Sequence, residues 1–316
     1  MARSSSSPVA APGTAAGAVP GGSLALDLLR SLRPAQWTKN LVVFAGLIFG
    51  KKLFEAAAVW DAIAAFVIFC ALSGVVYLVN DLADRESDRR HPLKARRPIA
   101  SGALPVKVAT GAALAIGAVA LAAAYLVGPG FAAVAAAYVV LQMLYSGPLK
   151  HIIIIDVLTI AIGFVLRVAA GAVVIDVPTS YWLLVCTILL ALFLALSKRR
   201  HELVLLADGA AGHRRILQEY SPYLLDQMIG VVTASTLMAY IIYATSPETA
   251  EKFGTSLLGL TIPFPLYGIF RYLYLVHQKE GGGSPSEMLL NDRPLLACVG
   301  LWGLAVAIII YRPLGI

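Results

Sequence analysis

Four residues that could bind a metal follow one another near position 80. Asn80, Asp81, Asp84 and Asp88 form the pattern N-D-x-x-D-x-x-x-D. In a continuous helix Asn80, Asp84 and Asp88 would share one face. Carboxylates on one face repel each other unless a cation lies between them, and Mg²⁺ typically binds a few carboxylates together with substrate phosphates. The pattern predicts a Mg²⁺-diphosphate site with Asp81, Asp84 and Asp88 as metal ligands and catalytic residues; the alternative is a solvated helix end.

A basic loop follows these acids directly. Residues 91–102 include Lys94, Arg96 and Arg97. Lysine and arginine side chains bind phosphate oxygens through charge-assisted hydrogen bonds, so acids for a metal followed by bases for phosphate are typical of a polyphosphate site. A basic loop beside a membrane span can also be an orientation signal, and that alternative stays open here.

Two further charges, Asp156 and Arg167, lie within an apolar run. A charge inside a membrane span costs at least about 2–3 kcal/mol and usually faces a cavity or a partner. Asp156 is near one end of the run and is a candidate ligand for metal or substrate. Arg167 lies about three turns deeper, and we expect it to pair with a polar group on another helix.

The elements that must position these residues are apolar. Of the 316 residues, 59% are hydrophobic and 14% are charged, whereas a soluble domain carries about a quarter charged residues. This composition excludes a soluble enzyme, a disordered chain and a disulfide scaffold, and the long apolar runs exclude a membrane β-barrel. We predict an all-α polytopic membrane protein with nine transmembrane helices. The nine segments cover roughly residues 41–58, 60–80, 106–127, 130–145, 152–174, 180–197, 226–245, 257–277 and 294–312.

The basic residues predict the orientation of the spans. The net charge is +7, and most of the 25 lysines and arginines fall on one side when nine spans alternate. By the positive-inside rule, the N-terminus and the charged loops face the cytoplasm, and the C-terminus lies outside. This distribution favours contact with lipid headgroups over nucleic acid. Residues 1–30 are predicted to be a disordered tail, followed by one transmembrane catalytic domain over 31–316.

The acids at 80–88 with the basic loop behind them resemble the first acidic motif of the UbiA-type prenyltransferase superfamily. The resemblance covers most of the chain from Leu32 onward. It implies a nine-helix intramembrane enzyme with Mg²⁺-dependent diphosphate chemistry and a cytoplasmic active site.

The second half of the predicted site departs from that pattern. Aromatic prenyltransferases of the superfamily carry a second D-x-x-x-D motif after the sixth span, whereas this chain has Lys198 and Glu202 at that spacing. The change removes a metal ligand and adds positive charge, which suits a substrate with a further phosphate. Residues 33–40, 145–150, 163–167 and 197–203 are similar to the branch of the family that transfers phosphoribose to a polyprenyl phosphate.

That branch implies Mg²⁺-dependent transfer of 5-phosphoribose from 5-phosphoribosyl 1-diphosphate to decaprenyl phosphate, for synthesis of an arabinan precursor of the actinobacterial cell wall. The substrate-binding residues that we expect are Lys39, Asn80, Lys94, Arg97, Tyr145, Lys150, Asp156, Lys198, Arg199 and Glu202. Two other functions stay open: prenyl transfer from an isoprenyl diphosphate to an aromatic acceptor, and membrane transport. The oligomeric state is also open, and a homo-oligomer is one option.

Overall fold

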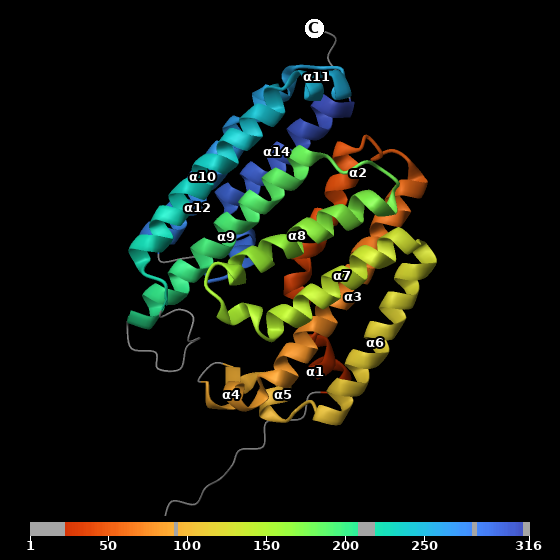
Figure 1. The fold of residues 1–316 in the computed structure, drawn as a ribbon, viewed down its shortest axis with the longest axis vertical. Coiled ribbons are helices and arrows are strands. Elements are labelled where there is room, and N and C mark those ends of the chain that lie inside the picture. Colours follow the sequence, from red (N-terminus) through yellow and green to blue (C-terminus); the bar gives the residue numbers. More distant parts are fainter. Residues whose placement is uncertain (1–22, 92–93, 208–218, 280–282, 312–316) are drawn as a thin grey trace, which may run out of the picture.

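The computed structural model describes residues 23–91, 94–207, 219–279 and 283–311, and every regular element in them is helical (Figure 1). The first half contains α1 (Leu24–Ser31), the 3₁₀ helix η1 (Pro34–Phe44), α2 (Ala45–Phe49), α3 (Ala56–Ala83), α4 (Arg85–Arg90), η2 (Lys94–Arg96), α5 (Pro98–Ser101), α6 (Val106–Val127) and α7 (Pro129–Ser146). The second half contains η3 (Leu149–His151), α8 (Ile155–Val174), α9 (Tyr181–Ala207), α10 (Pro222–Thr245), α11 (Pro247–Phe253), η5 (Leu257–Thr261), α12 (Pro263–Gln278), α13 (Pro285–Asn291) and α14 (Arg293–Tyr311).

Seven of the described helices are long and apolar enough to cross a membrane: α3, α6, α7, α8, α9, α10 and α14. A further pair, α11 with the segment Leu257–Gln278, passes the same test together and is bent by 103°. The described helices therefore supply seven spans, or eight if the bent pair is one. All of these spans coincide with predicted apolar segments, so the prediction of a multi-pass all-α protein is confirmed, although the count of nine is not.

The prediction of a single spanning helix over residues 41–58 was wrong. The structure has η1 and α2 there, followed by a turn before α3. A 3₁₀ helix rises about 2 Å per residue and an α-helix about 1.5 Å, so η1 and α2 together extend over about 30 Å, which matches a hydrocarbon core. In Figure 1, α1 lies at one end of the molecule and α2 toward the other. Residues 41–58 are therefore divided between the end of η1, α2, a turn and the start of α3, and they do not form one spanning helix.

Two glycines allow η1 and α2 to pack closely on α8. A Cβ atom at Gly171 of α8 would overlap the carbonyl group of Val43, and one at Gly46 would lie 3.0 Å from the backbone of Ala172. The backbones thus approach each other with no side chain between them, as small residues permit between membrane helices. This contact places η1 in the interior of the bundle, between α3 and α8.

Arg167 of α8 is buried among neutral groups from two other elements. Its Nε donates to Asn40 Oδ1 at 2.7 Å, its Nη2 to the Tyr138 hydroxyl at 2.7 Å, and its Nη1 to the Gly163 carbonyl at 2.9 Å. Asn40 belongs to η1 and Tyr138 to α7. This arrangement confirms the expectation that Arg167 pairs with polar groups on other helices, and it joins α8 to η1 and α7.

The predicted tail over residues 1–30 overlaps a helix. The Ser23 hydroxyl accepts a hydrogen bond from the Leu26 N–H and caps α1, in which Asp27 is buried; residues 1–22 lie outside the described part. Helices α1, α4 and α5 gather at one end of the molecule, whereas α11 lies at the opposite end (Figure 1). The single-domain organisation over 31–316 stays a prediction.

Candidate functional site

The acidic motif lies at the junction of α3 and α4, at the end of the molecule that also carries α1 and α5 (Figure 1). Asp84 interrupts the helix here, so the expected common face of Asn80, Asp84 and Asp88 is broken. Asp81 and Asp88 are buried, Asn80 is half-buried, and the side chain of Asp84 is 42% exposed. The break therefore separates two buried carboxylates from one that solvent can reach.

Two arginines hold the buried carboxylates. Arg33 Nη2 donates to Asp81 Oδ1 at 2.5 Å. Arg97 Nη1 donates to Asp81 Oδ1 at 3.1 Å and to Asp88 Oδ2 at 2.7 Å, and Lys94 Nζ lies 4.0 Å from Asp88 Oδ1. Two acids that would repel each other are thus joined by a cation, as the motif predicts, but the cation in this structure is the Arg97 guanidinium.

Arg33 was not among the predicted site residues. Its backbone has a φ of 54°, a left-handed conformation that costs a non-glycine residue about 1–3 kcal/mol. Its guanidinium lies 4.7 Å from the centre of the Tyr77 ring and contacts Asp81. These contacts hold the strained residue in place. In the sequence, Arg33 belongs to the stretch 33–40 that carries the resemblance, and no local pattern connects it with Asp81, which is 48 positions away.

A third segment reaches the acids from the loop after α7. Lys150 Nζ, in η3, lies 3.3 Å from Asp84 Oδ1. The structure therefore brings together the predicted residues Asp81, Asp84, Asp88, Lys94, Arg97 and Lys150. Asn80 lies next to Asp81 near the end of α3.

A second charged cluster surrounds Arg199, which is fully buried in α9. Its Nε donates to Asp156 Oδ2 at 2.8 Å, its Nη1 to Glu202 Oε2 at 2.5 Å, and its Nη2 to the Tyr145 hydroxyl at 3.2 Å. Asp156 has no exposed surface. Asp156 and Arg199 were expected to bind substrate, but here they bind each other. Arg199 thus holds Glu202 and Tyr145 in place, and the substrate-binding roles of Asp156, Arg199, Glu202 and Tyr145 stay predictions.

Tyr220, which precedes α10, completes this cluster and was also missed. Its hydroxyl donates to Asp156 Oδ1 at 2.9 Å and accepts from the backbone N–H of Ile154 at 2.8 Å. Burial, reinforced by the hydrogen bond to Asp156, raises the pKa of Tyr220 to about 12. Ile154 has a φ of 69° immediately before α8, so Tyr220 stabilises a strained helix start beside Asp156. Neighbouring residues give no signal for a contact over 64 positions.

Two predicted substrate-binding lysines, Lys198 of α9 and Lys39 of η1, lie outside the acid cluster. Lys198 Nζ lies 3.8 Å from Glu202 Oε1. Lys39 of η1 lies within electrostatic range of Lys198, Arg167 and Arg33. Basic side chains from η1, α8 and α9 are therefore close enough to repel one another, and a bound polyanion would relieve that repulsion.

The aspartates fit a divalent cation by donor type, although the described residues include no group of three His, Cys, Asp or Glu side chains that could hold a metal ion. Asp81 and Asp88 approach one nitrogen of Arg97, so their oxygens already converge on a positive charge. Oxygen donors suit Mg²⁺. The metal-ligand roles of Asp81, Asp84 and Asp88 stay a prediction.

Comparison with known proteins places the chain among membrane transferases. The model of the UbiA prenyltransferase family matches residues 40–291. The chain is 33% identical over 298 residues to a decaprenyl-phosphate phosphoribosyltransferase of Corynebacterium glutamicum, which covers 92% of this chain and 88% of that protein. A protein of the same name from Mycobacterium tuberculosis is 31% identical over 300 residues, 91% of this chain and 97% of that one.

The fold has been seen in a solved structure. A UbiA homologue from Archaeoglobus fulgidus bound to GPP and Mg²⁺ superimposes with a TM-score of 0.70 at 21% sequence identity, over 89% of this chain and 99% of that chain. At this identity the likeness shows the fold alone.

Proposed function

The chain belongs to the UbiA prenyltransferase family, and we propose that it transfers 5-phosphoribose from 5-phosphoribosyl 1-diphosphate to decaprenyl phosphate. Family membership makes it a multi-pass membrane transferase. The sugar donor, the release of pyrophosphate, the use of Mg²⁺ and a role in cell-wall arabinan synthesis belong to the proposal.

The observation that carries the proposal is the basic character of the second half of the site. Lys198 stands where an acid would complete a second acidic motif, and Lys39 lies within its electrostatic range. A donor that carries a phosphate on C5 as well as a diphosphate on C1 supplies an additional anion for these lysines. The relatives named decaprenyl-phosphate phosphoribosyltransferase, 31–33% identical over about nine-tenths of the chain, support the same substrates.

The two clusters suggest how the donor is bound. Arg97, Lys94 and Lys150 contact carboxylates in the structure, and on donor binding they would turn to the diphosphate oxygens. Lys39 and Lys198 would bind the 5-phosphate. Glu202, held by Arg199, lies 3.8 Å from Lys198, and a carboxylate there suits a ribose hydroxyl. Binding thus exchanges internal ion pairs for pairs with the ligand.

The reaction needs little proton transfer. A phosphate oxygen of the lipid attacks C1 of the ribose, and the C1–O bond to the diphosphate breaks with its electron pair leaving on pyrophosphate. The acceptor phosphate is already anionic at neutral pH, so no side chain has to remove a proton. Mg²⁺ bound to Asp81, Asp84 and Asp88 would neutralise charge that develops on the leaving group. Arg97 and Lys150, once turned from the carboxylates to the diphosphate, would donate hydrogen bonds to the same charge.

The same charge distribution supports a location for the site. The acid cluster and its bases lie at one end of the molecule, with α1, α4 and α5 (Figure 1). With the positive-inside rule, this end faces the cytoplasm of a bacterial inner membrane and the C-terminus lies outside.

The test mixes the purified protein with Mg²⁺, decaprenyl phosphate and 5-phosphoribosyl 1-diphosphate labelled in the ribose. We expect label to enter the organic phase only when protein, lipid phosphate and metal are all present. A parallel reaction with a labelled isoprenyl diphosphate and an aromatic acid tests the prenyltransferase alternative. Label transfer in that reaction alone would overturn the proposal.

A further inference from the structure

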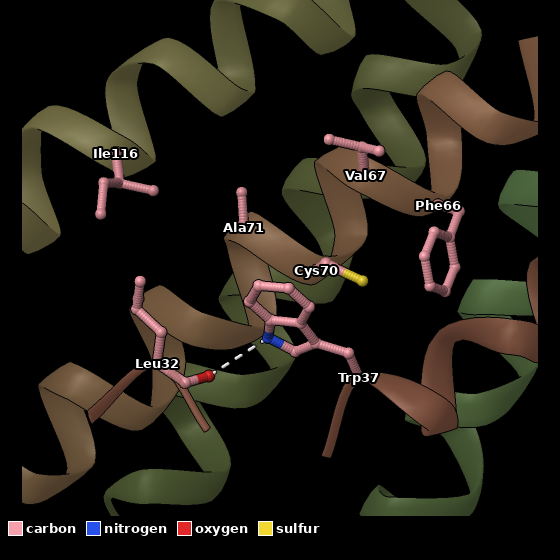
Figure 2. A pocket seen from close by; sticks show the side chains of 7 residues that line it. All are labelled: Leu32, Trp37, Phe66, Val67, Cys70, Ala71 and Ile116. Atoms are coloured by element: carbon pink, nitrogen blue, oxygen red, sulfur yellow. Dashed lines mark hydrogen bonds between the residues drawn. The ribbon is translucent and has the colours of Figure 1, made fainter. Parts of the chain in front are cut away.

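An apolar groove lies on the side of α3 that faces α6, outside the charged site. Its first part has a volume of about 230 Å³ and is lined by Leu32, Trp37, Phe66, Cys70 and Ile116 with two smaller residues of α3. Figure 2 shows these side chains, which come from four segments: the residue that follows α1, η1, α3 and α6. Every lining side chain is apolar or a thiol, so the groove suits hydrocarbon.

The groove continues along α3 and α6. A second part, about 350 Å³, shares Val67, Ala71 and Ile116 with the first and extends to Val119 and Ala123 of α6. The side chains at its rim are open to the surroundings, since Val67 is 58% and Val119 is 70% exposed. Both helices are membrane spans, so the groove opens sideways toward the bilayer over several helical turns.

One end of the groove is connected to the acid cluster. Leu32 lines this end, and the next residue, Arg33, contacts Asp81. The indole N–H of Trp37 donates to the Leu32 carbonyl at 3.2 Å, which fixes the ring across the end of the groove (Figure 2). An apolar groove, closed at this end by Trp37, and an arginine that can bind phosphate follow one another here, in the order of the tail and the phosphate headgroup of a lipid.

We propose that this groove binds the isoprenoid chain of the polyprenyl-phosphate acceptor, with its phosphate beside Arg33. The inference rests on the proposed function and adds to it the path of the lipid. Bilayer and groove are equally apolar, so the groove contributes van der Waals contacts rather than a hydrophobic driving force. Its contribution is therefore to hold the chain, and with it the phosphate, in register with the sugar.

Filling the groove tests the proposal. Ala115 and Ala122 are both exposed alanines of α6, but only Ala115 lines the groove. We expect Ala115→Trp to lower kcat/KM for decaprenyl phosphate by about tenfold, since misplacement of a reacting group has effects of this order or larger. The matched variant Ala122→Trp should leave it unchanged. Ala123→Phe provides a second groove variant in case Ala115→Trp does not fold.

A five-carbon prenyl phosphate separates the possible results, because its tail is too short to occupy the groove. With this acceptor, we expect the kcat/KM of Ala115→Trp to equal that of the unsubstituted protein. The KM for the sugar donor should also be unchanged. An equal loss with both acceptors, or no loss with either, overturns the groove proposal while the proposed function stands. A change of oligomeric state or of bound phospholipid without a change in decaprenyl kinetics also overturns it. If the unsubstituted protein transfers phosphoribose to neither acceptor, the proposed function itself fails.

Discussion

At the scale of single residues, the charged side chains of the site form ion pairs with one another. Arg97 bridges Asp81 and Asp88, and Lys150 contacts Asp84. Each pair keeps a charge stable at the end of a membrane span in the absence of ligand. In the proposed reaction, the same pairs would open when a metal binds the carboxylates and phosphates bind the basic side chains. An ion pair opens most easily where one of its residues is partly exposed. Such residues are therefore the best positions for substitutions that change function and leave the fold intact.

Asp84→Asn is the first such substitution. Asp84 is 42% exposed, so loss of its charge should change stability by no more than about 0.5 kcal/mol. We expect transfer of phosphoribose to be abolished, because the amide is a poorer ligand for Mg²⁺ than the carboxylate. Turnover and thermal unfolding of the purified variant check this. Glu86→Gln, an exposed acid of α4, is the control, and normal turnover by Asp84→Asn would exclude Asp84 as a metal ligand.

Lys198→Asp tests the other half of the site. Reversal of this charge should weaken binding of 5-phosphoribosyl 1-diphosphate by one to two orders of magnitude, given about 1.5–3 kcal/mol for a charged hydrogen bond. Equilibrium dialysis with the labelled donor measures the change. Lys107→Asp reverses an exposed charge of α6 and should bind normally, whereas Lys198→Arg should restore most of the affinity. Unchanged donor affinity in Lys198→Asp would remove Lys198 from the site.

Sequence reasoning found the residues of the acid cluster but not all of their roles. The acids and Lys94 with Arg97 lie close in sequence, so their common site was predictable from spacing. Arg33 and Tyr220 contact their partners over 48 and 64 positions, and local pattern carries no such information. Asp156 was recognised as unusual because it is a charge in an apolar run. Its partner, the buried Arg199, is 43 positions away, and only the fold shows that contact.

At the scale of elements, η1 is the part that the sequence predicted least well. The length and composition of an apolar run predict an α-helix, and this prediction is correct for the later spans. A 3₁₀ helix of 11 residues is rare, and nothing in residues 34–44 distinguishes it from an ordinary apolar helix start. What maintains it lies elsewhere: Arg167 bonds Asn40 at its centre, and Gly171 leaves room for its backbone. The tertiary contact therefore decides the helix type.

Gly171→Ala should show this dependence. The added Cβ meets the backbone of Val43, which cannot turn away as a side chain would, so η1 must shift. We expect a loss of about 1–3 kcal/mol of stability, the usual cost of overpacking, measured by thermal unfolding in detergent. Gly117→Ala in α6 is the matched control, since its Cβ would meet Val75 at an ordinary 3.7 Å and alanine favours a helix by about 0.5–1 kcal/mol. Equal unfolding temperatures for the two variants would contradict the close contact.

At the scale of the whole molecule, α8 lies between two groups of helices, with α3, α6 and α7 on one side and α9, α10 and α12 on the other (Figure 1). The acid cluster lies at the end of α3 in the first group, and the charged cluster around Arg199 and Lys198 lies on α9 in the second. The proposed reaction between the two clusters requires that the two groups of helices keep a fixed distance. Arg167 joins α8 to η1 and α7, and Asp156 joins it to α9 and to Tyr220 before α10.

Tyr220→Phe tests this second connection, because the loss of one hydroxyl removes a hydrogen bond to Asp156 and another to Ile154. The variant should lose about 1–3 kcal/mol of stability, the cost of leaving buried partners unsatisfied.

The pKa of Tyr220 is raised to about 12 in the folded protein, against about 10 when unfolded. A raised pKa stabilises the fold below pH 10, and that contribution disappears as the pH rises toward 12. The stability difference from the unsubstituted protein should therefore be constant between pH 7 and pH 9 and shrink above pH 10. Tyr223→Phe, a change at a 74% exposed tyrosine, should show neither effect, and a Tyr220→Phe difference that persists unchanged to pH 12 would exclude this hydroxyl as the connection.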